Sequence, residues 1–346
     1  MQKRPLGATG FDVTVLGLGG VFVSNIGADR QAGKQTIKRA LELGINYIDT
    51  ARSYADSEDV IGEALQEAAP SSLPIVATKI GGWPEPFQPK DTAALRKSVA
   101  ESLKLLRLPA VQGMFVHEPD RPALFDWWDD DEAVVGPVLE LLAELKANGT
   151  IAFNGLAGTT AYEVARRAAS GKFDTVLTAF NYSLLWREAE HALLPVAKEH
   201  GMGVVVGAPL QQGALAERYD NELATATWIS PPRKRQYEEL YRLLDDLKMP
   251  LHELALRWVI SNPDISTVVV GARNIQEIER NVEAAEKGGL ARDVLAEVDR
   301  ISAIVPFRPF EEPGGAFGLP FRAEYRGPGA LAGTSSVGGI KKGENA

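Results

Sequence analysis

The sequence alternates short, β-branched apolar segments with longer amphipathic segments along most of its length. Eight short segments have the composition of buried strands: Val15–Gly19, Tyr47–Asp49, Ile75–Ile80, Met114–His117, Phe153–Ala157, Thr175–Phe180, Val204–Ala208 and Thr267–Val270. Between them, apolar residues recur at helical spacing, and most of these segments end at Gly or Asn-Gly. Strands that alternate with helices pair in parallel, because each helix returns the chain to the same end of the sheet. Eight such units predict an α/β fold, a (β/α)8 TIM barrel.

The alternative is an open, doubly wound sheet. Its dinucleotide-binding loop needs three spaced glycines, and the segment Gly17–Phe22 lacks the third. We therefore expect residues 1–305 to form a single barrel, capped at its bottom by an N-terminal hairpin over Arg4–Leu6 and Val13–Val15, with an additional helix over Arg233–Leu247. Residues 306–346 form a Gly- and Pro-rich tail. We expect its aromatic first half to pack on the barrel and its end to be disordered.

Composition excludes several classes of function. The net charge of −9 argues against nucleic acid and anionic membranes as partners. There is no cysteine, and the four histidines lack the spacing of a metal site, so we predict no metal. No apolar run reaches the roughly 20 residues of a membrane span, and no signal peptide is recognised, so a cytoplasmic location is predicted. The oligomeric state stays open, and a homo-oligomer is one option.

Four reactive side chains are predicted to meet at one end of the barrel. Asp49, Lys79 and His117 end the second, third and fourth strands, and Tyr54 follows the second strand. Each residue alone has an ordinary structural explanation, such as a helix cap or a solvated lysine. Together they favour an active site, because barrel sites lie at the C-terminal ends of strands and buried ionisable groups are costly unless they pair.

The four residue types suit proton transfer to a carbonyl oxygen. A tyrosine with its ordinary pKa of about 10 is a poor acid at neutral pH, and a nearby ammonium lowers that pKa. A carboxylate would hold the ammonium of Lys79, and the imidazole of His117 would orient the substrate oxygen. No side chain supplies a hydride, so this chemistry requires a cofactor.

These residues resemble the catalytic tetrad of the aldo-keto reductases. The resemblance runs from Arg4-Pro5-Leu6-Gly7 to about Ala285; its matching motifs are Leu16–Gly20, Gly44–Ala51 followed by Tyr54, Ala77-Thr78-Lys79, Phe115-Val116-His117, Val270–Arg273 and Glu279-Arg280-Asn281. Within the family the chain is most similar to the aldose 1-dehydrogenase and sugar-reductase branches, on the segment Val206–Leu210. The resemblance implies a barrel that uses NAD(P)H, with Tyr54 as proton donor.

The resemblance also implies a set of cofactor contacts: Gly20, Val21, Asp49, Asn181, Gly207, Ala208, Pro209, Leu210, Gln212, Gly271, Ala272, Arg273, Glu277 and Asn281. Three positions depart from the family pattern around the nicotinamide ring. Gly207 replaces a stacking tyrosine, Ala157-Gly158 replaces a Ser-Asn pair, and Ala179 replaces a glutamine. Asn181 or Tyr182 is the expected compensation.

The preference between NAD and NADP stays undecided from the sequence. Glu277 and Gly271 stand where many NADPH-specific relatives carry cations, which disfavours a 2′-phosphate. Arg273 is a candidate phosphate partner, which favours one.

Aromatic residues in the strand–helix loops are the predicted substrate contacts, together with His117: Phe22, Trp83, Trp127, Trp128 and Trp186. Trp128 begins the acidic run that ends at Glu132. Aromatic faces and carboxylates suit a sugar, but an ordinary solvated loop explains the run equally well.

The sequence thus predicts an NAD(P)-dependent oxidoreductase that acts on a small sugar-like aldehyde or its lactol. One alternative is an aromatic, pyridoxal-type aldehyde dehydrogenase. A second is a cofactor-binding regulatory subunit with slow turnover. A metal-dependent barrel aldolase or hydrolase is disfavoured, because the sequence lacks ligand clusters.

Overall fold

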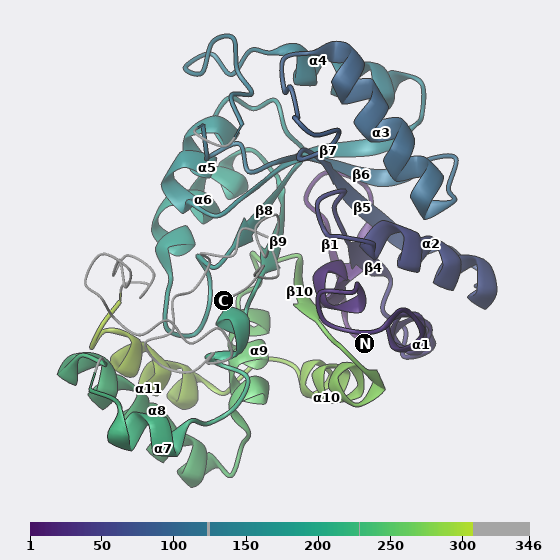
Figure 1. Ribbon diagram of the computed structural model, residues 1–346. Helices are drawn as coiled ribbons and strands as arrows, with labels where there is room; N and C mark the ends of the chain where they lie inside the picture. The colour runs from purple at the N-terminus through teal and green to yellow at the C-terminus, as the bar shows by residue number, and fades with distance from the viewer. Residues whose placement is uncertain (123–124, 228, 307–346) are drawn as a thin grey trace, which may run out of the picture.

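The computed structural model describes residues 1–122, 125–227 and 229–306. In this part of the chain, eight parallel strands close into a barrel in the order β10-β3-β4-β5-β6-β7-β8-β9 (Figure 1). The strands are β3 (Leu16–Gly19), β4 (Tyr47–Asp49), β5 (Ile75–Ile80), β6 (Val111–His117), β7 (Ile151–Gly158), β8 (Thr175–Ala179), β9 (Gly203–Gly207) and β10 (Thr267–Gly271). The predicted (β/α)8 fold is confirmed.

Helices separate the strands in sequence and surround the barrel (Figure 1). Those that connect or follow the strands are α1 (Arg30–Glu42), α2 (Ser57–Ala68), α3 (Thr92–Leu106), α4 (Pro137–Ala147), α5 (Ala161–Ala168), α6 (Glu188–Glu199), α9 (Leu251–Ser261) and α10 (Ile275–Glu286). Additional helices are α7 (Asp220–Thr225) and α8 (Pro231–Leu247), before α9, and α11 (Arg292–Ser302). Short 3-10 turns, η1 (Gly20–Val23) and η2 (Gln211–Gly213), follow β3 and β9.

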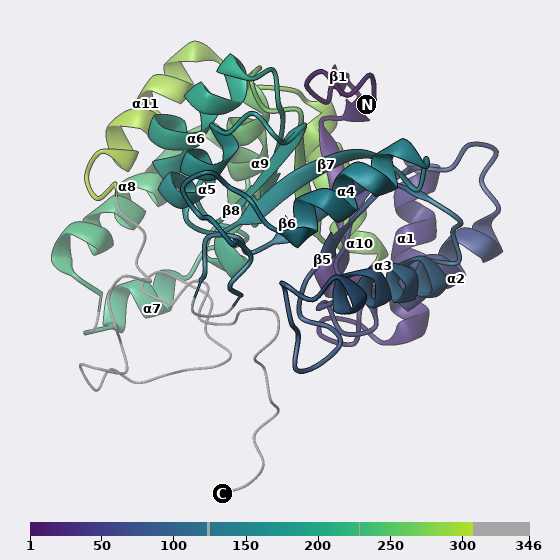
Figure 2. The same cartoon turned by 90° about the horizontal axis from the view of Figure 1, so that it is seen from above.

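The predicted N-terminal hairpin closes the end of the barrel opposite the strand C-termini (Figure 2). Strand β1 (Lys3–Pro5) pairs antiparallel with β2 (Asp12–Thr14). The Leu6 side chain, fully buried, packs with the barrel interior. Arg4 donates to the carbonyls of Ile260, Asn262 and Ile265, which precede β10. These contacts fix the hairpin at the bottom and leave the other end for a site.

Alternation along each strand sorts the side chains into two layers. One layer fills the barrel with residues such as Tyr47, Phe115 and Phe153, and the other packs between the strands and the helices. At the C-terminal ends, the interior positions of neighbouring strands are Asp49, Lys79 and His117.

Some boundaries differ from the sequence predictions for physical reasons. Strand β6 begins at Val111 rather than Met114, because its pairing with β7 already starts with Val111 opposite Ile151. The sequence analysis missed α11, which packs on α8 through bonds from Gln236 to the last carbonyls of α11.

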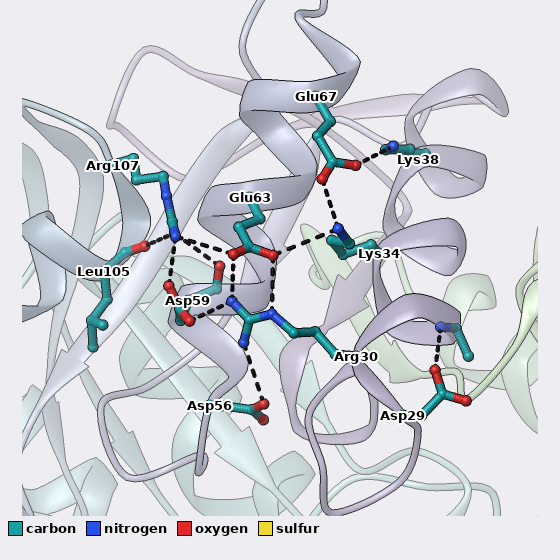
Figure 3. A network of polar contacts seen from close by, with 11 residues as sticks. Asp29, Arg30, Lys34, Lys38, Asp56, Asp59, Glu63, Glu67, Leu105 and Arg107 are labelled. Atoms are coloured by element: carbon teal, nitrogen blue, oxygen red, sulfur yellow. Dashed lines mark hydrogen bonds and ion pairs between the residues drawn. The ribbon is translucent and has the colours of Figure 1, made fainter.

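A network of ion pairs joins α1, α2 and the end of α3 (Figure 3). Arg30 pairs with Asp59 and with Glu63 from one helix to the next. Arg107 contacts Asp59 at 2.8 Å from the other side. Arg30 also lies 3.7 Å from the carboxylate of Asp56, in the loop that carries Tyr54. The network therefore ties that loop to α1.

No helix among the described residues is long and apolar enough to span a bilayer. Apart from Pro306, the tail predicted over 306–346 lies outside the described residues, so its predicted packing and disorder stay predictions.

Candidate active site

Asp49, Tyr54, Lys79 and His117 lie together at the C-terminal mouth of the barrel. The Lys79 Nζ atom donates to Asp49 Oδ2 and to the Thr50 carbonyl, each at 2.7 Å. The same ammonium lies 4.6 Å from the centroid of the Tyr54 ring. The Tyr54 and His117 rings meet edge to face with their centroids 5.7 Å apart. The structure thus brings together the four residues that the sequence singled out.

Local backbone geometry directs Tyr54 toward this group. The loop after β4 turns tightly, because the Tyr54 amide donates to the Ala51 carbonyl at 3.0 Å and the Ser57 amide donates to the Tyr54 carbonyl at 2.9 Å. Helix α2 then starts at Ser57, whose hydroxyl bonds Thr50 and the Gly20 carbonyl. The loop is fixed on both sides of the tyrosine.

Burial dominates the electrostatics of the four groups. Lys79 is 1% exposed and Asp49 4% exposed, so they form a buried ion pair. Burial acts to lower the pKa of Lys79, but Asp49 and Tyr54 outweigh it and hold that pKa above its ordinary value. Burial raises the pKa of Asp49, and Lys79 opposes this. The lysine is therefore a fixed cation at neutral pH.

The pKa of Tyr54 differs from the simplest sequence prediction. Burial raises it above its ordinary value, and the Lys79 ammonium opposes that rise. Lys79 does act in the predicted direction, but in this structure desolvation outweighs it. The tyrosine is therefore protonated at neutral pH, which is the form that donates a proton.

His117 is neutral. Burial, together with the Lys79 ammonium and the Arg121 guanidinium, lowers its pKa well below the ordinary value. Its Nδ1 atom lies 3.2 Å from the Ser53 hydroxyl, and its backbone carbonyl accepts from Trp127 Nε1 at 3.1 Å. Sequence reasoning missed Ser53, because only the turn of the loop shows that it reaches the imidazole.

The opposite half of the mouth is lined by residues with little or no side chain. The interior positions at the ends of β3, β7, β8, β9 and β10 are Gly19, Ala157, Ala179, Gly207 and Gly271. A Cβ atom on Gly207 would meet Leu177 at 3.3 Å and Ala179 at 3.5 Å and nothing nearer. The Phe22 ring packs over Gly271, so these positions present backbone and small side chains beside the four polar groups.

The loop after β9 has the unusual backbone that often accompanies ligand sites. Ala208, Gln211 and Gln212 all have positive φ angles, as does Phe180 at the end of β8. Gln211 donates to the Phe180 carbonyl at 3.1 Å, and its buried Oε1 has no partner among the described residues. The structure thus singles out Gln211 beside the predicted contacts Ala208, Pro209, Leu210 and Gln212. Its free acceptor atom fits a donor on a bound cofactor.

Asn181, the predicted compensating residue, is 2% exposed, and its side-chain amide points back to β8, the strand that precedes it. Its Nδ2 donates to Thr178 at 3.2 Å and to the Ala179 carbonyl at 2.9 Å. Tyr182, the other candidate, bonds Asn262 and packs on Trp258. Both residues are therefore engaged with the protein.

The loop from β10 to α10 places Arg273 and Glu277 together. The Glu277 carboxylate accepts from the Arg273 amide at 2.8 Å, and its Oε1 lies 2.9 Å from Nε and 2.7 Å from Nη2 of the same residue. Asn274 caps the helix by accepting from the Glu277 amide. Ala272 is buried just before this pair, and Asn281 is buried one turn further along α10. The guanidinium of Arg273 is thus already paired with a carboxylate.

The predicted substrate contacts fall into two groups. Phe22, 38% exposed, lies on η1 next to Val21 and packs over Gly271, and Trp83 contacts the cations of Arg52 and Lys97. The other three tryptophans are buried in the core: Trp127, Trp128 and Trp186. Trp127 lies next to the four polar groups, since its Nε1 donates to the His117 carbonyl; the contacts of these residues with a substrate stay predictions.

The acidic run after Trp128 is largely engaged within the protein. Asp130 accepts from the amides of Glu132 and Ala133. Asp131 pairs with Arg166 and Arg167 of α5. These contacts favour the structural explanation of the run. Among the described residues, no group of three or more acidic or histidine side chains could hold a metal ion.

Comparison with known proteins agrees with this geometry. The sequence model of the Aldo/keto reductase family matches residues 15–303. L-galactose dehydrogenase from Arabidopsis thaliana is 30% identical over 329 residues, which cover 91% of this chain and 98% of that protein. A putative voltage-gated potassium channel subunit beta from Schizosaccharomyces pombe is 28% identical over 333 residues, with 88% and 94% covered.

A solved structure is similar along the same length. The holo form of the aldo-keto reductase AKR11C1 from Bacillus halodurans superposes with a TM-score of 0.70 at 26% identity, covering 89% of this chain and 98% of that one. The chain therefore belongs to the aldo/keto reductase family of oxidoreductases, whose enzymes use NAD(P)H.

Proposed function

We propose that this protein transfers a hydride between NAD(P)H and the carbonyl, or lactol, carbon of a small sugar-like aldehyde. The observation that carries the proposal is the position of the Lys79 ammonium, held at 2.7 Å from Asp49 and from the Thr50 carbonyl and 4.6 Å from the Tyr54 ring centroid. A buried, fixed cation beside a buried phenol stabilises the phenolate that remains after proton donation.

Each of the four residues has one role in this proposal. Tyr54 gives its hydroxyl proton to the substrate oxygen in reduction and takes it back in oxidation. Lys79 stabilises the resulting phenolate, and Asp49 keeps Lys79 in place. His117, which is neutral, holds the substrate oxygen. The cofactor, when bound, supplies or accepts the hydride.

The cofactor would lie across the half of the mouth that has small side chains. Gly207 and Ala179 would hold the nicotinamide, and the loop after β9 and the start of α10, where backbone amides favour anions, would hold the phosphates. Arg273 is paired with Glu277. This pairing supports NADH over NADPH, because the cation that a 2′-phosphate needs is already neutralised.

The side chains at the rim suit a small polar substrate. Phe22 and Trp83 offer apolar faces at the mouth, and apolar faces stack on sugar rings. We infer that residues 1–305 act as one catalytic unit in the cytoplasm on a diffusible substrate. The similarity to L-galactose dehydrogenase supports a sugar as the substrate.

The decisive experiment is a panel of sugars, small aldehydes and pyridoxal, assayed in both directions with NAD(H) and NADP(H) separately. The proposal predicts the highest kcat/KM for a sugar, with NAD(H). Faster turnover of pyridoxal would favour the aromatic alternative.

A regulatory subunit is the second candidate, and the similarity to a putative potassium channel subunit favours it. Tight cofactor binding without turnover of any compound in the panel would support that function instead. The intact tetrad argues for turnover, because a subunit that only binds cofactor does not need a proton donor.

A further inference from the structure

Ser53 and His117 are held against each other across the mouth. Ser53 directly precedes Tyr54, and its Oγ lies 3.2 Å from the Nδ1 atom of His117. The loop after β5 confines both side chains. A Cβ atom on Gly81 would approach the His117 Cβ to 3.0 Å, and one on Gly82 would approach the Ser53 Cβ to 3.2 Å.

This contact bears on the protonation of the imidazole. A neutral imidazole has one nitrogen that donates and one that accepts, and the partner of one nitrogen decides the state of the other. Burial, together with the charges of Lys79 and Arg121, lowers the pKa of His117 and keeps it neutral. Either tautomer can bond a hydroxyl, because the serine can donate or accept.

The second nitrogen selects between the two tautomers. Among the described residues, Nε2 of His117 has no hydrogen-bond partner, so it is the nitrogen available to a ligand. A carbonyl oxygen can only accept a hydrogen bond. To hold that oxygen, Nε2 must carry the hydrogen, and Nδ1 must then accept. The Ser53 hydroxyl has no other hydrogen-bond partner in the described structure. If Ser53 donates to Nδ1, its hydroxyl hydrogen therefore also gains a partner.

We propose that Ser53 is a positioning residue, which donates to Nδ1 of His117 and thereby fixes the tautomer with hydrogen on Nε2, aimed at the substrate oxygen. This inference rests on the proposed function for its purpose, but the tautomer is a property of the free protein. Ser53 acts on the substrate through His117 and does not itself contact the substrate.

The first test reads the tautomer directly by ¹⁵N NMR of histidine-labelled protein. The chain has four histidines, so the His117 signals are assigned by their absence in His117→Asn. The wild type is expected to show a protonated Nε2 and an unprotonated Nδ1. Ser53→Ala should shift His117 toward a mixture of tautomers, and Ser53→Thr, which keeps the hydroxyl, should restore the wild-type signals. A protonated Nδ1 in the wild type, or an unchanged His117 in Ser53→Ala, would overturn the proposal.

The matched control is Ser98→Ala. Ser98 lies on α3, is 1% exposed, and its hydroxyl has no partner in the described structure. Its removal takes away the same atom from a buried site away from the imidazole. The signals of His117 should not move in this variant.

The second test measures turnover. Loss of one neutral hydrogen bond that organises a catalytic group typically costs about 3- to 10-fold. We expect that loss in kcat for Ser53→Ala with unchanged cofactor affinity, full activity in Ser98→Ala and recovery in Ser53→Thr. If Ser53→Ala shifts the tautomer of His117 but neither the wild type nor any variant turns over a sugar, the proposed function fails and the role of Ser53 stands. If turnover is normal in Ser53→Ala, the inference fails and the proposed function stands.

Discussion

Replacing Glu277 by glutamine should shift cofactor preference toward NADP(H). In the structure, the Glu277 carboxylate accepts hydrogen bonds from Nε and Nη2 of Arg273 at 2.9 and 2.7 Å. The substitution removes that negative charge and frees the guanidinium, while glutamine keeps the length of the side chain and an acceptor for the Arg273 amide. A 2′-phosphate would then find an unpaired cation and no carboxylate.

Two effects of similar size contribute to the expected change. The Arg273 side chain is 61% exposed, so a new contact with phosphate is worth only about 1 kcal/mol, at the top of the range for exposed ion pairs. Removing repulsion between two negative charges near the surface contributes roughly another 1 kcal/mol. The sum of about 2 kcal/mol corresponds to a change of about 30-fold in the NADP/NAD affinity ratio.

The assay is fluorescence titration of both reduced cofactors with wild type and variant, at low and high salt. The shift should shrink as salt rises, because Arg273 is exposed. Glu279→Gln is the matched control: Glu279 lies on the same helix but pairs with Arg39 of α1. An unchanged ratio in Glu277→Gln, or an equal shift in Glu279→Gln, would refute the placement of Glu277 beside the ribose.

Two further predictions concern protonation. Lys79→Met removes the cation that opposes the burial-raised pKa of Tyr54, so activity should fall severely and the pH–rate limb of the phenol should move upward; an unmoved limb would contradict the Lys79–Tyr54 interaction. Lys34 and Lys38 lower the pKa of Glu67 from 4.5 to about 2. A lowered folded-state pKa stabilises the fold above the unfolded value, and this contribution is lost as pH falls through the folded value. Urea unfolding should therefore show the wild type more stable than Glu67→Gln above pH 4.5, with the difference vanishing toward pH 2; a constant difference would contradict it.

The strand ends are the part of the site that sequence could predict. Asp49, Lys79 and His117 each stand at the end of a recognisable apolar segment, and the parallel barrel brings such ends to one mouth. Their grouping follows from the periodicity of the strands alone, so no knowledge of side-chain contacts was needed.

Loops and burial were harder to predict. The contact of Ser53 with His117 depends on the turn after β4, and no pattern in the sequence encodes that turn. The sequence also did not show how deeply the loop tryptophans are buried: Trp127 and Trp186 are 0% and 1% exposed. Helix α11 was missed because it follows the last barrel helix, where the alternation of strands and helices no longer guides prediction.

The central claim is that the Tyr54 hydroxyl transfers the proton that accompanies hydride transfer. Stopped-flow measurement of nicotinamide oxidation in a single turnover, with the best sugar substrate, tests it most directly in Tyr54→Phe. The claim predicts a rate about 100- to 10,000-fold below wild type, as is typical for loss of a general acid, with cofactor affinity unchanged. A Tyr54→Phe variant that transfers hydride at close to the wild-type rate would contradict it.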